Sequence, residues 1–212
     1  MIPGPIYVVT DTTVQSRFSH LQLVRAALAG GADIIQLRMK EGSTRSILEV
    51  ARECSALCRR AHVPFLVNDR TDIAWAADAD GVHLGDDDLP LSLARSLLGP
   101  HRILGASADN IEDVIARGRE GADYCGIGPV FDTSTKTDAG PVLGIDNLAR
   151  SVDGSPVPLV AIGGMTLERI AEVAATGVHA VALVSAICAA DDPEAATRRA
   201  RELWIRVRGA TD

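Results

Sequence analysis

Three polar side chains alternate along one short stretch of the chain, Gln36-Leu37-Arg38-Met39-Lys40. Because alternate residues of a β-strand point to the same face, Gln36, Arg38 and Lys40 would share one face if this stretch is a strand. A solvated strand end would also account for them. The regular alternation and the two cations favour instead a site that binds an anion.

Two acidic stretches follow neighbouring apolar runs. Asn68-Asp69-Arg70 comes after the first run, and Asp86-Asp87-Asp88 comes after the second, residues 81–85. Carboxylates from adjacent strand ends can share a Mg²⁺ ion, which then bridges to substrate phosphates. Acidic loops are often merely solvated, but the nearby cations favour a metal–diphosphate site. His83 could face this site or could be a structural histidine.

Hydroxyl and glycine residues follow the later predicted strands: those up to the sixth strand extend the cationic site, and those after the last two suggest a second, neutral site for a monophosphate. Ser107 ends another predicted strand, and the hydroxyl-rich loop 132–137 holds Lys136. This loop could donate hydrogen bonds to phosphate oxygens, or it could be an ordinary surface loop. Gly163-Gly164 and Val184-Ser185 follow the last two predicted strands, where backbone N–H groups of barrel enzymes often bind phosphate. The residues alone therefore indicate a magnesium-dependent enzyme that acts on phosphorylated small molecules.

Short β-branched runs alternate with amphipathic segments along the whole chain. The runs predict eight strands, at residues 6–10, 34–38, 65–68, 81–84, 103–107, 124–128, 159–162 and 180–184. The amphipathic segments predict helices that include residues 21–29, 46–60, 91–98, 111–119, 167–175 and 193–207. Strands that alternate with helices pair in parallel through right-handed crossovers.

Similar short segments precede every second predicted strand, at residues 29–33, 77–81, 120–123 and 176–179. In three of the four, a glycine can adopt the left-handed conformation that ends a helix. A repeat at every second strand is typical of a barrel built from four βαβα quarters. We therefore predict a single (β/α)8 TIM barrel over residues 1–212, with an open doubly wound sheet as the alternative.

The composition limits the classes of partner. The chain has 212 residues and a formal net charge of −7, which argues against nucleic acid or an anionic membrane as a general partner. Of its 21 basic residues only Lys40 and Lys136 are lysines. Neither a signal peptide nor a long apolar segment is evident, and the four cysteines form no zinc motif. We therefore expect a cytoplasmic enzyme of small molecules, and leave open whether it forms a homo-oligomer.

Several motifs resemble those of the thiamine-phosphate synthase family in order and spacing, from about Tyr7 to Asp192. They are Tyr7-Val8-Val9-Thr10-Asp11, Gln36-Leu37-Arg38-Met39-Lys40, Asn68-Asp69-Arg70, Gly81-Val82-His83-Leu84-Gly85, residues 126–136 and Ile162-Gly163-Gly164. The resemblance implies a transferase that joins a pyrimidine diphosphate to a thiazole phosphate and releases diphosphate, with Mg²⁺ as cofactor. In this family the diphosphate is thought to depart first and leave a pyrimidine cation.

The resemblance also implies a role for individual residues. Those that would bind the pyrimidine diphosphate are Gln36, Arg38, Lys40, Asn68, His83, Ser107 and Lys136. Catalysis would depend on Arg38, Lys40, Lys136 and Ser107. The magnesium ligands would be Asp69 and Asp88. The thiazole phosphate would contact Thr133, Thr135, Gly164, Val184 and Ser185.

The chain departs from the family pattern in two places. Met39 stands where relatives usually carry Glu, but alternation turns it away from the predicted site. Ala108-Asp109-Asn110 stands where many relatives have a histidine. A thiazole tautomerase on the same barrel is the nearest alternative. It needs a histidine after the fifth predicted strand, and this is where the chain resembles it least. A non-catalytic protein that binds a phosphorylated ligand is the second alternative.

Overall fold

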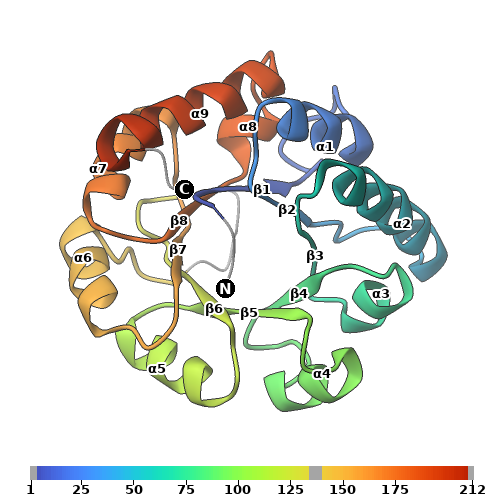
Figure 1. Cartoon of the computed structure of the whole chain (residues 1–212), viewed down its shortest axis with the longest axis horizontal. Coiled ribbons are helices and arrows are strands. Elements are labelled where there is room, and N and C mark those ends of the chain that lie inside the picture. Colours follow the sequence, from blue (N-terminus) through green and yellow to red (C-terminus); the bar gives the residue numbers. More distant parts are fainter. Residues whose placement is uncertain (1–3, 134–139, 210–212) are drawn as a thin grey trace.

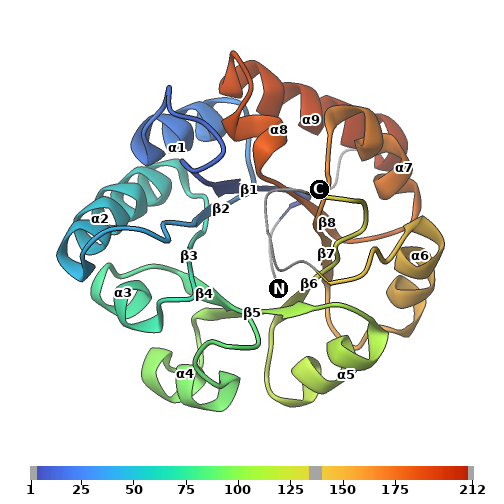
Figure 2. The same ribbon diagram turned by 180° about the vertical axis from the view of Figure 1, so that it is seen from behind.

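Eight parallel strands form a closed barrel in this computed structural model, which describes residues 4–133 and 140–209. Each strand pairs with the next in sequence, and the last pairs with the first, so the described sheet has no free edge. Figures 1 and 2 show this ring from its two sides, with the helices outside it. The strands are β1 (Ile6–Thr10), β2 (Ile34–Leu37), β3 (Phe65–Asn68), β4 (Gly81–Leu84), β5 (Ile103–Ala108), β6 (Tyr124–Ile127), β7 (Leu159–Ala161) and β8 (Ala180–Leu183).

Helices follow the strands and cover the outside of the barrel (Figure 1). They are α1 (His20–Ala29), α2 (Thr44–Ala61), α3 (Thr71–Ala76), α4 (Leu91–Leu98), α5 (Ile111–Arg119), α6 (Ile145–Gly154), the 3₁₀ turn η1 (Leu167–Arg169), α7 (Ile170–Ala175), α8 (Ser185–Cys188) and α9 (Pro193–Arg208). Side-chain oxygens of Ser19, Ser43, Asn110 and Asp192 accept hydrogen bonds from the first turns of α1, α2, α5 and α9. These caps satisfy backbone donors that have no partner inside the helix.

The predicted (β/α)8 barrel is confirmed, and the eight predicted strands match the observed ones to within a residue at their ends. The expected helix at residues 167–175 is a 3₁₀ turn that continues into α7. Three further helices lie outside the helical segments named from the sequence: α3, α6 and α8. None of them begins with a side-chain cap, so the usual sequence signal for a helix start is missing at each.

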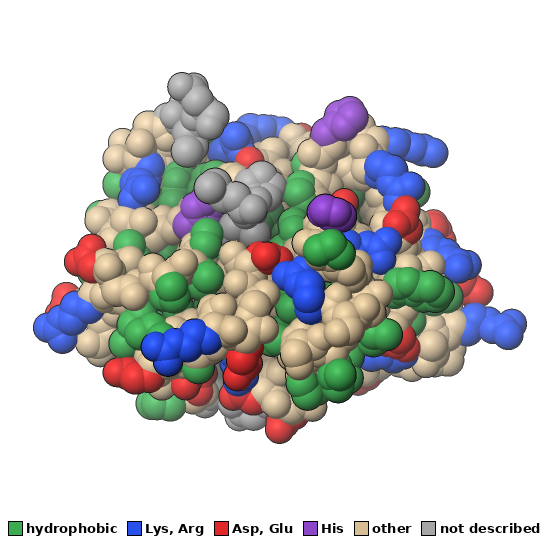
Figure 3. Space-filling model, turned by 60° about the horizontal axis from the view of Figure 1, so that its bottom comes forward, with side chains coloured by type: hydrophobic (Ala, Val, Ile, Leu, Met, Phe, Trp, Pro, Cys, Tyr) green, Lys and Arg blue, Asp and Glu red, His purple; other side chains and the backbone are tan. Residues whose placement is uncertain are grey.

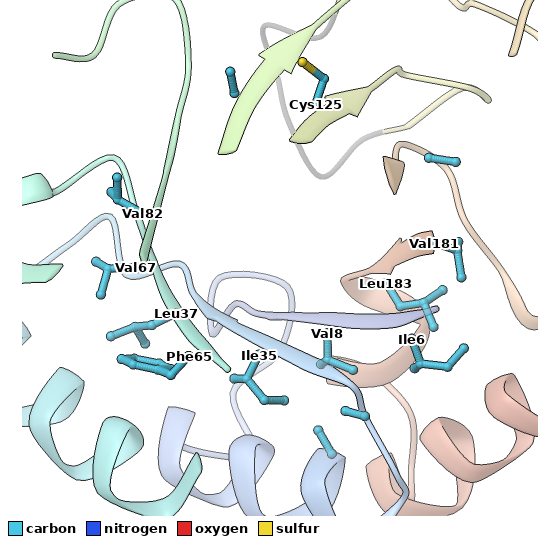
Figure 4. Packing of buried hydrophobic residues seen from close by; sticks show 14 of the residues in the cluster. Ile6, Val8, Ile35, Leu37, Phe65, Val67, Val82, Cys125, Val181 and Leu183 are labelled. Carbon is cyan, nitrogen blue, oxygen red and sulfur yellow. The ribbon is translucent and has the colours of Figure 1, made fainter. Parts of the chain in front are cut away.

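The hydrophobic residues pack in two layers because strand residues alternate between the two faces of the sheet. Side chains of one set, among them Ile35, Leu37 and Phe65, point outward against the helices (Figure 4). The other set fills the barrel interior with Tyr7, Val9, Ile34, Leu66, Tyr124, Val160, Ala180 and Ala182. This inner layer closes the floor beneath the carboxyl ends of the strands, so polar residues there rest on a packed base.

Residues in the left-handed backbone conformation end helices at the places that the sequence repeat predicts. Gly31, Gly121 and Gly177 all have positive φ, from 86° to 100°. The fourth repeat has no glycine at the corresponding place, and Asp78 adopts the left-handed conformation there with φ 51°. Aspartate tolerates this conformation better than most side chains do. The repeat therefore reflects a common way of turning the chain from helix into strand.

The outer surface shows no concentration of one charge on the face seen in Figure 3, where basic and acidic side chains are interspersed. Within the described residues, no helix is both long and apolar enough to cross a membrane.

Candidate functional site

One cavity of about 260 Å³ opens at the carboxyl ends of the strands. Residues from β1 to β8 or from the loops after them line it, so the closed barrel brings together side chains that are far apart in sequence. All the predicted site residues that the structure describes lie in its lining: Gln36, Arg38, Lys40, Asn68, Asp69, His83, Asp88, Ser107, Thr133, Gly164, Val184 and Ser185. The other two, Thr135 and Lys136, lie outside the described residues.

Arg38 is held by an acidic residue from the neighbouring strand end. Its Nη1 donates to Oδ2 of Asp11, which follows β1 and is fully buried. The other oxygen of Asp11 accepts from the backbone N–H of Thr13 at 2.8 Å and from its hydroxyl at 2.6 Å. A buried charge paired in this way has a fixed position, so the guanidinium is held at the rim of the cavity.

Lys40 meets a carboxylate of the next strand. Its Nζ lies 2.5 Å from Oδ2 of Asp69, and both side chains retain access to solvent. Asp69 has a φ of 64°, although it is not a glycine, and its N–H donates to the carbonyl of His83 at 2.8 Å. A side chain kept in this sparsely populated backbone region is a common feature of functional sites. The strained turn directs the carboxylate of Asp69 toward Lys40.

Asp88 faces Asp69 at the same edge of the cavity. The Gly85 N–H donates to its Oδ2 at 2.7 Å, which fixes the turn that carries it. Burial raises the pKa of Asp88, and the neighbouring charge of Asp69 acts in the same direction, while the Gly85 bond and Lys40 oppose them. A divalent cation would relieve the repulsion between the two carboxylates.

The donor set fits a magnesium ion that also binds substrate. Within the described part of the chain, no three His, Cys, Asp or Glu side chains surround a common point. Asp69 and Asp88 would therefore supply two protein oxygens. Mg²⁺ commonly binds through one or two carboxylates and takes its other ligands from phosphates and water.

The opposite side of the cavity is lined by glycines and small polar residues. Gly163 and Gly164 have φ of 95° and 64°, and a side chain at Gly164 would come within 2.4 Å of the Asp132 carbonyl oxygen. No other residue could let the loop after β6 come so close to the loop after β7. Ser185 also belongs to the cavity lining and is exposed. The two sides of the cavity therefore differ in charge, as the sequence predicts.

His83 and Ser107 are hydrogen-bonded to each other across β4 and β5, with His83 Nε2 3.1 Å from Ser107 Oγ. The other ring nitrogen of His83 lies 2.9 Å from the hydroxyl of Tyr124. The sequence left open whether His83 faces the site or is a structural histidine. Its ring does both, since it lines the cavity and is held by two hydrogen-bond partners. Met39 packs against the hydrophobic core outside the barrel, in agreement with its predicted direction.

Sequence reasoning missed three residues of this site: Asp11, Tyr7 and Tyr124. Asp11 and Tyr7 belong to a motif that was recognised, but nothing in the sequence pairs Asp11 with Arg38 or Tyr7 with Tyr124. A polar position after β1, beside the cations of β2, could have indicated Asp11, because neighbouring strand ends meet in a parallel sheet. Tyr124 gives no such signal.

Known proteins resemble this chain over nearly its whole length. A family model described as "Thiamine monophosphate synthase" matches residues 6–187. A thiamine-phosphate synthase of Chloroflexus aurantiacus is 47% identical over 93% of this chain and 91% of that protein. One of Syntrophomonas wolfei is 44% identical over 95% of this chain and 96% of that protein.

The fold comparison gives the same result. The solved structure of a thiamine phosphate pyrophosphorylase from Pyrococcus furiosus matches with a TM-score of 0.88 and 37% identity, and the match covers 96% of both chains. The matches in sequence and in structure agree with the motifs that meet in the cavity. This chain belongs to the thiamine monophosphate synthase family.

Proposed function

We propose that this chain synthesises thiamine phosphate from 4-amino-2-methyl-5-hydroxymethylpyrimidine diphosphate and 4-methyl-5-(2-phosphoethyl)thiazole. The observation that carries the proposal is the asymmetry of the cavity at the carboxyl ends of the strands. Arg38, Lys40, Asp69 and Asp88 lie on one side of it, and the glycine-lined turn after β7 lies on the other. A site of this kind suits one substrate with a diphosphate and another with a monophosphate.

The reaction breaks the bond between the pyrimidine methylene carbon and a diphosphate oxygen. Diphosphate departs with the electrons of this bond. The thiazole nitrogen donates its electron pair to the methylene carbon and forms the new C–N bond. In the dissociative form of this displacement, positive charge develops on the pyrimidine and negative charge on the leaving group. Neither partner needs a strong base, so charge stabilisation and alignment would supply most of the catalysis.

The two cations that follow β2 would stabilise the leaving group. Arg38, fixed by Asp11, offers a rigid donor, and Lys40 offers a mobile ammonium that can move from Asp69 to a diphosphate oxygen. We propose the same role for Lys136. Gln36, Asn68, His83 and Ser107 would hold the pyrimidine over the packed floor of the barrel.

Mg²⁺ would be held by Asp69 and Asp88, where it would neutralise charge on the diphosphate. The facing carboxylates support this assignment, since burial and like charge both disfavour the ionised form of Asp88 without a cation. Thr133, Thr135, Gly164, Val184 and Ser185 would bind the thiazole phosphate from the opposite side.

The test is a reaction of the purified chain with both substrates and Mg²⁺, with separate detection of thiamine phosphate and of diphosphate. Equimolar formation of both products is expected. Binding of both substrates without product would overturn the proposal, and isomerisation of the thiazole alone would indicate the tautomerase.

We further propose a cytoplasmic location. Its support is that all four cysteines are free and buried, as is common in a reducing compartment. Homo-oligomer formation stays a prediction that size-exclusion chromatography with light scattering would test.

A further inference from the structure

Hydrogen bonds join five side chains from five different strands at the base of the cavity. Gln36 Nε2 donates to Tyr7 Oη at 2.7 Å, and the hydroxyls of Tyr7 and Tyr124 lie 2.8 Å apart. The chain continues from Tyr124 Oη to His83 Nδ1 at 2.9 Å and from His83 Nε2 to Ser107 Oγ at 3.1 Å. Its two ends, Gln36 and Ser107, are both cavity residues predicted to bind the pyrimidine.

The two tyrosines in the middle of this chain are neutral and enclosed. Tyr7 is 2% exposed and Tyr124 is 0% exposed, and their ring centroids are 6.0 Å apart. Burial raises the pKa of both hydroxyls well above the ordinary value, so each keeps its hydrogen. A buried hydroxyl hydrogen without an acceptor would be costly, so the direction of each bond matters.

Two glycines make room for the rings of the chain. A side chain at Gly105 would lie 2.3 Å from Cζ of Tyr124, and one at Gly126 would lie 3.1 Å from Cε1 of His83. The strand register places Gly105 directly beside both rings, since it pairs with Tyr124 on one side and with His83 on the other. Glycines of β5 and β6 therefore leave the space that the rings of Tyr124 and His83 occupy.

The direction of the bonds follows from the Gln36 end. The amide nitrogen of Gln36 can only donate, so the Tyr7 oxygen accepts from it. The Tyr7 hydrogen then has the Tyr124 oxygen as its acceptor, and the Tyr124 hydrogen has His83 Nδ1. A neutral histidine that accepts at Nδ1 carries its hydrogen at Nε2, and this hydrogen points to Ser107 Oγ.

We propose that Tyr7 and Tyr124 are positioning residues that hold His83 in the Nε2–H tautomer and thereby make Ser107 a hydrogen-bond donor to the substrate. Ser107 accepts from His83, so its own hydrogen is directed into the cavity. There it meets an acceptor such as a ring nitrogen of a pyrimidine. The amide oxygen at the other end, on Gln36, accepts from the substrate. The identity of the pyrimidine rests on the proposed function, whereas the tautomer of His83 does not.

The tautomer is tested without any substrate. We would record two-bond ¹H–¹⁵N correlations of the full chain with ¹⁵N-labelled histidines, at a pH where histidine is neutral, and assign His83 from its absence in His83→Gln. The expected spectrum shows the Nε2–H form. An Nδ1–H form would mean that the bonds from Tyr7 through Tyr124 and His83 to Ser107 run in the opposite direction, and it would overturn the proposal even if the enzyme is active.

Variants then test whether the tyrosines set this state. Tyr124→Phe should shift His83 toward a mixture of tautomers and raise KM for the pyrimidine diphosphate about tenfold, the effect of losing one buried hydrogen bond. The KM for the thiazole phosphate should stay unchanged. Tyr7→Phe keeps the Tyr124 hydroxyl next to His83, so its effect on the His83 spectrum should be smaller.

A matched control removes a buried hydroxyl elsewhere. Thr197 of α9 is fully buried and its hydroxyl donates to the Pro193 carbonyl at 2.7 Å, so Thr197→Val should leave the His83 signals as in the wild type. Wild-type His83 signals in folded Tyr124→Phe would contradict the positioning role. If that variant does not fold, the spectrum of the wild type still decides the direction of the bonds.

Discussion

Lys40 Nζ and Asp69 Oδ2 lie 2.5 Å apart, so the cation that ends the alternating motif of β2 contacts the carboxylate after β3. Asp69 in turn faces Asp88, so one cation and two neighbouring carboxylates lie along one edge of the cavity. A metal ion and Lys40 would both be attracted to Asp69. Binding of metal there would leave the ammonium available to a phosphate oxygen.

Replacement of Lys40 tests its charge. Lys40→Met should lower kcat/KM on the order of 10²-fold, as the loss of one charge-stabilising donor does. Because the side chain is about half exposed, the free energy of unfolding should change by less than about 0.5 kcal/mol. Lys40→Arg should recover part of the activity. Steady-state kinetics and denaturant unfolding measure both effects, and wild-type kcat/KM in Lys40→Met would remove Lys40 from the mechanism.

Replacement of Asp88 should separate stability from activity. Asp88→Asn retains an oxygen for the Gly85 N–H and removes the charge that faces Asp69. We therefore expect a higher Tm than the wild type in the presence of a chelator, together with activity lower on the order of 10²-fold at fixed Mg²⁺. Thermal melts with and without Mg²⁺ provide the measurement. A lower Tm in chelator would show that the two carboxylates do not repel each other in the folded chain.

The buried partner of Arg38 should matter for folding and for turnover. Asp11→Asn leaves the guanidinium without its counter-charge, which should lower the free energy of unfolding by about 1–3 kcal/mol. It should also lower kcat/KM for the pyrimidine diphosphate about tenfold or more. Asp191→Asn is the control, because its carboxylate pairs with Arg17 at the surface and should contribute little. Equal effects of the two substitutions would contradict the special role of Asp11.

His20 should make stability depend on pH. Burial lowers its pKa below the ordinary 6.5, an effect that Asp11 partly offsets, so the unfolded chain binds a proton at His20 more readily than the folded chain does. The free energy of unfolding should therefore decrease as the pH falls from about 6.5 through the lower pKa of the folded state. His20→Gln should remove this part of the pH dependence. His101→Gln, at an exposed histidine, should leave this part of the pH dependence unchanged. Identical pH profiles for the two variants would refute the assignment to His20.

Much of the fold could be predicted because the signals are local. Strand runs, helix faces and helix-ending glycines each depend on a few neighbouring residues, and parallel pairing follows from their alternation. The gathering of Gln36, Asp69, Ser107 and Gly164 in one cavity follows from the barrel, since the carboxyl ends of its strands meet at one face.

Contacts that depend on register could not be predicted in this way. Tyr7 and Tyr124 are separated by 117 positions, and their hydroxyls meet inside the closed barrel although β1 and β6 are not neighbouring strands. The capture of Arg38 by Asp11 likewise depends on how the chain leaves β1. Such pairs involve the polar side chains that hold the site residues in place. The sequence therefore indicated which residues line the cavity, but not which partners hold them there.

The most direct test of the account is the metal dependence of thiamine phosphate formation. Wild-type chain, Asp69→Ala and Asp86→Ala would be compared with both substrates, with Mg²⁺ and with a chelator, and both products would be measured. We predict product from the wild type and Asp86→Ala with Mg²⁺, none with chelator, and little from Asp69→Ala. Product that persists in chelator, or at the wild-type rate in Asp69→Ala, would contradict the proposed metal site. Absence of product from wild-type chain that binds both substrates would contradict the proposed function itself.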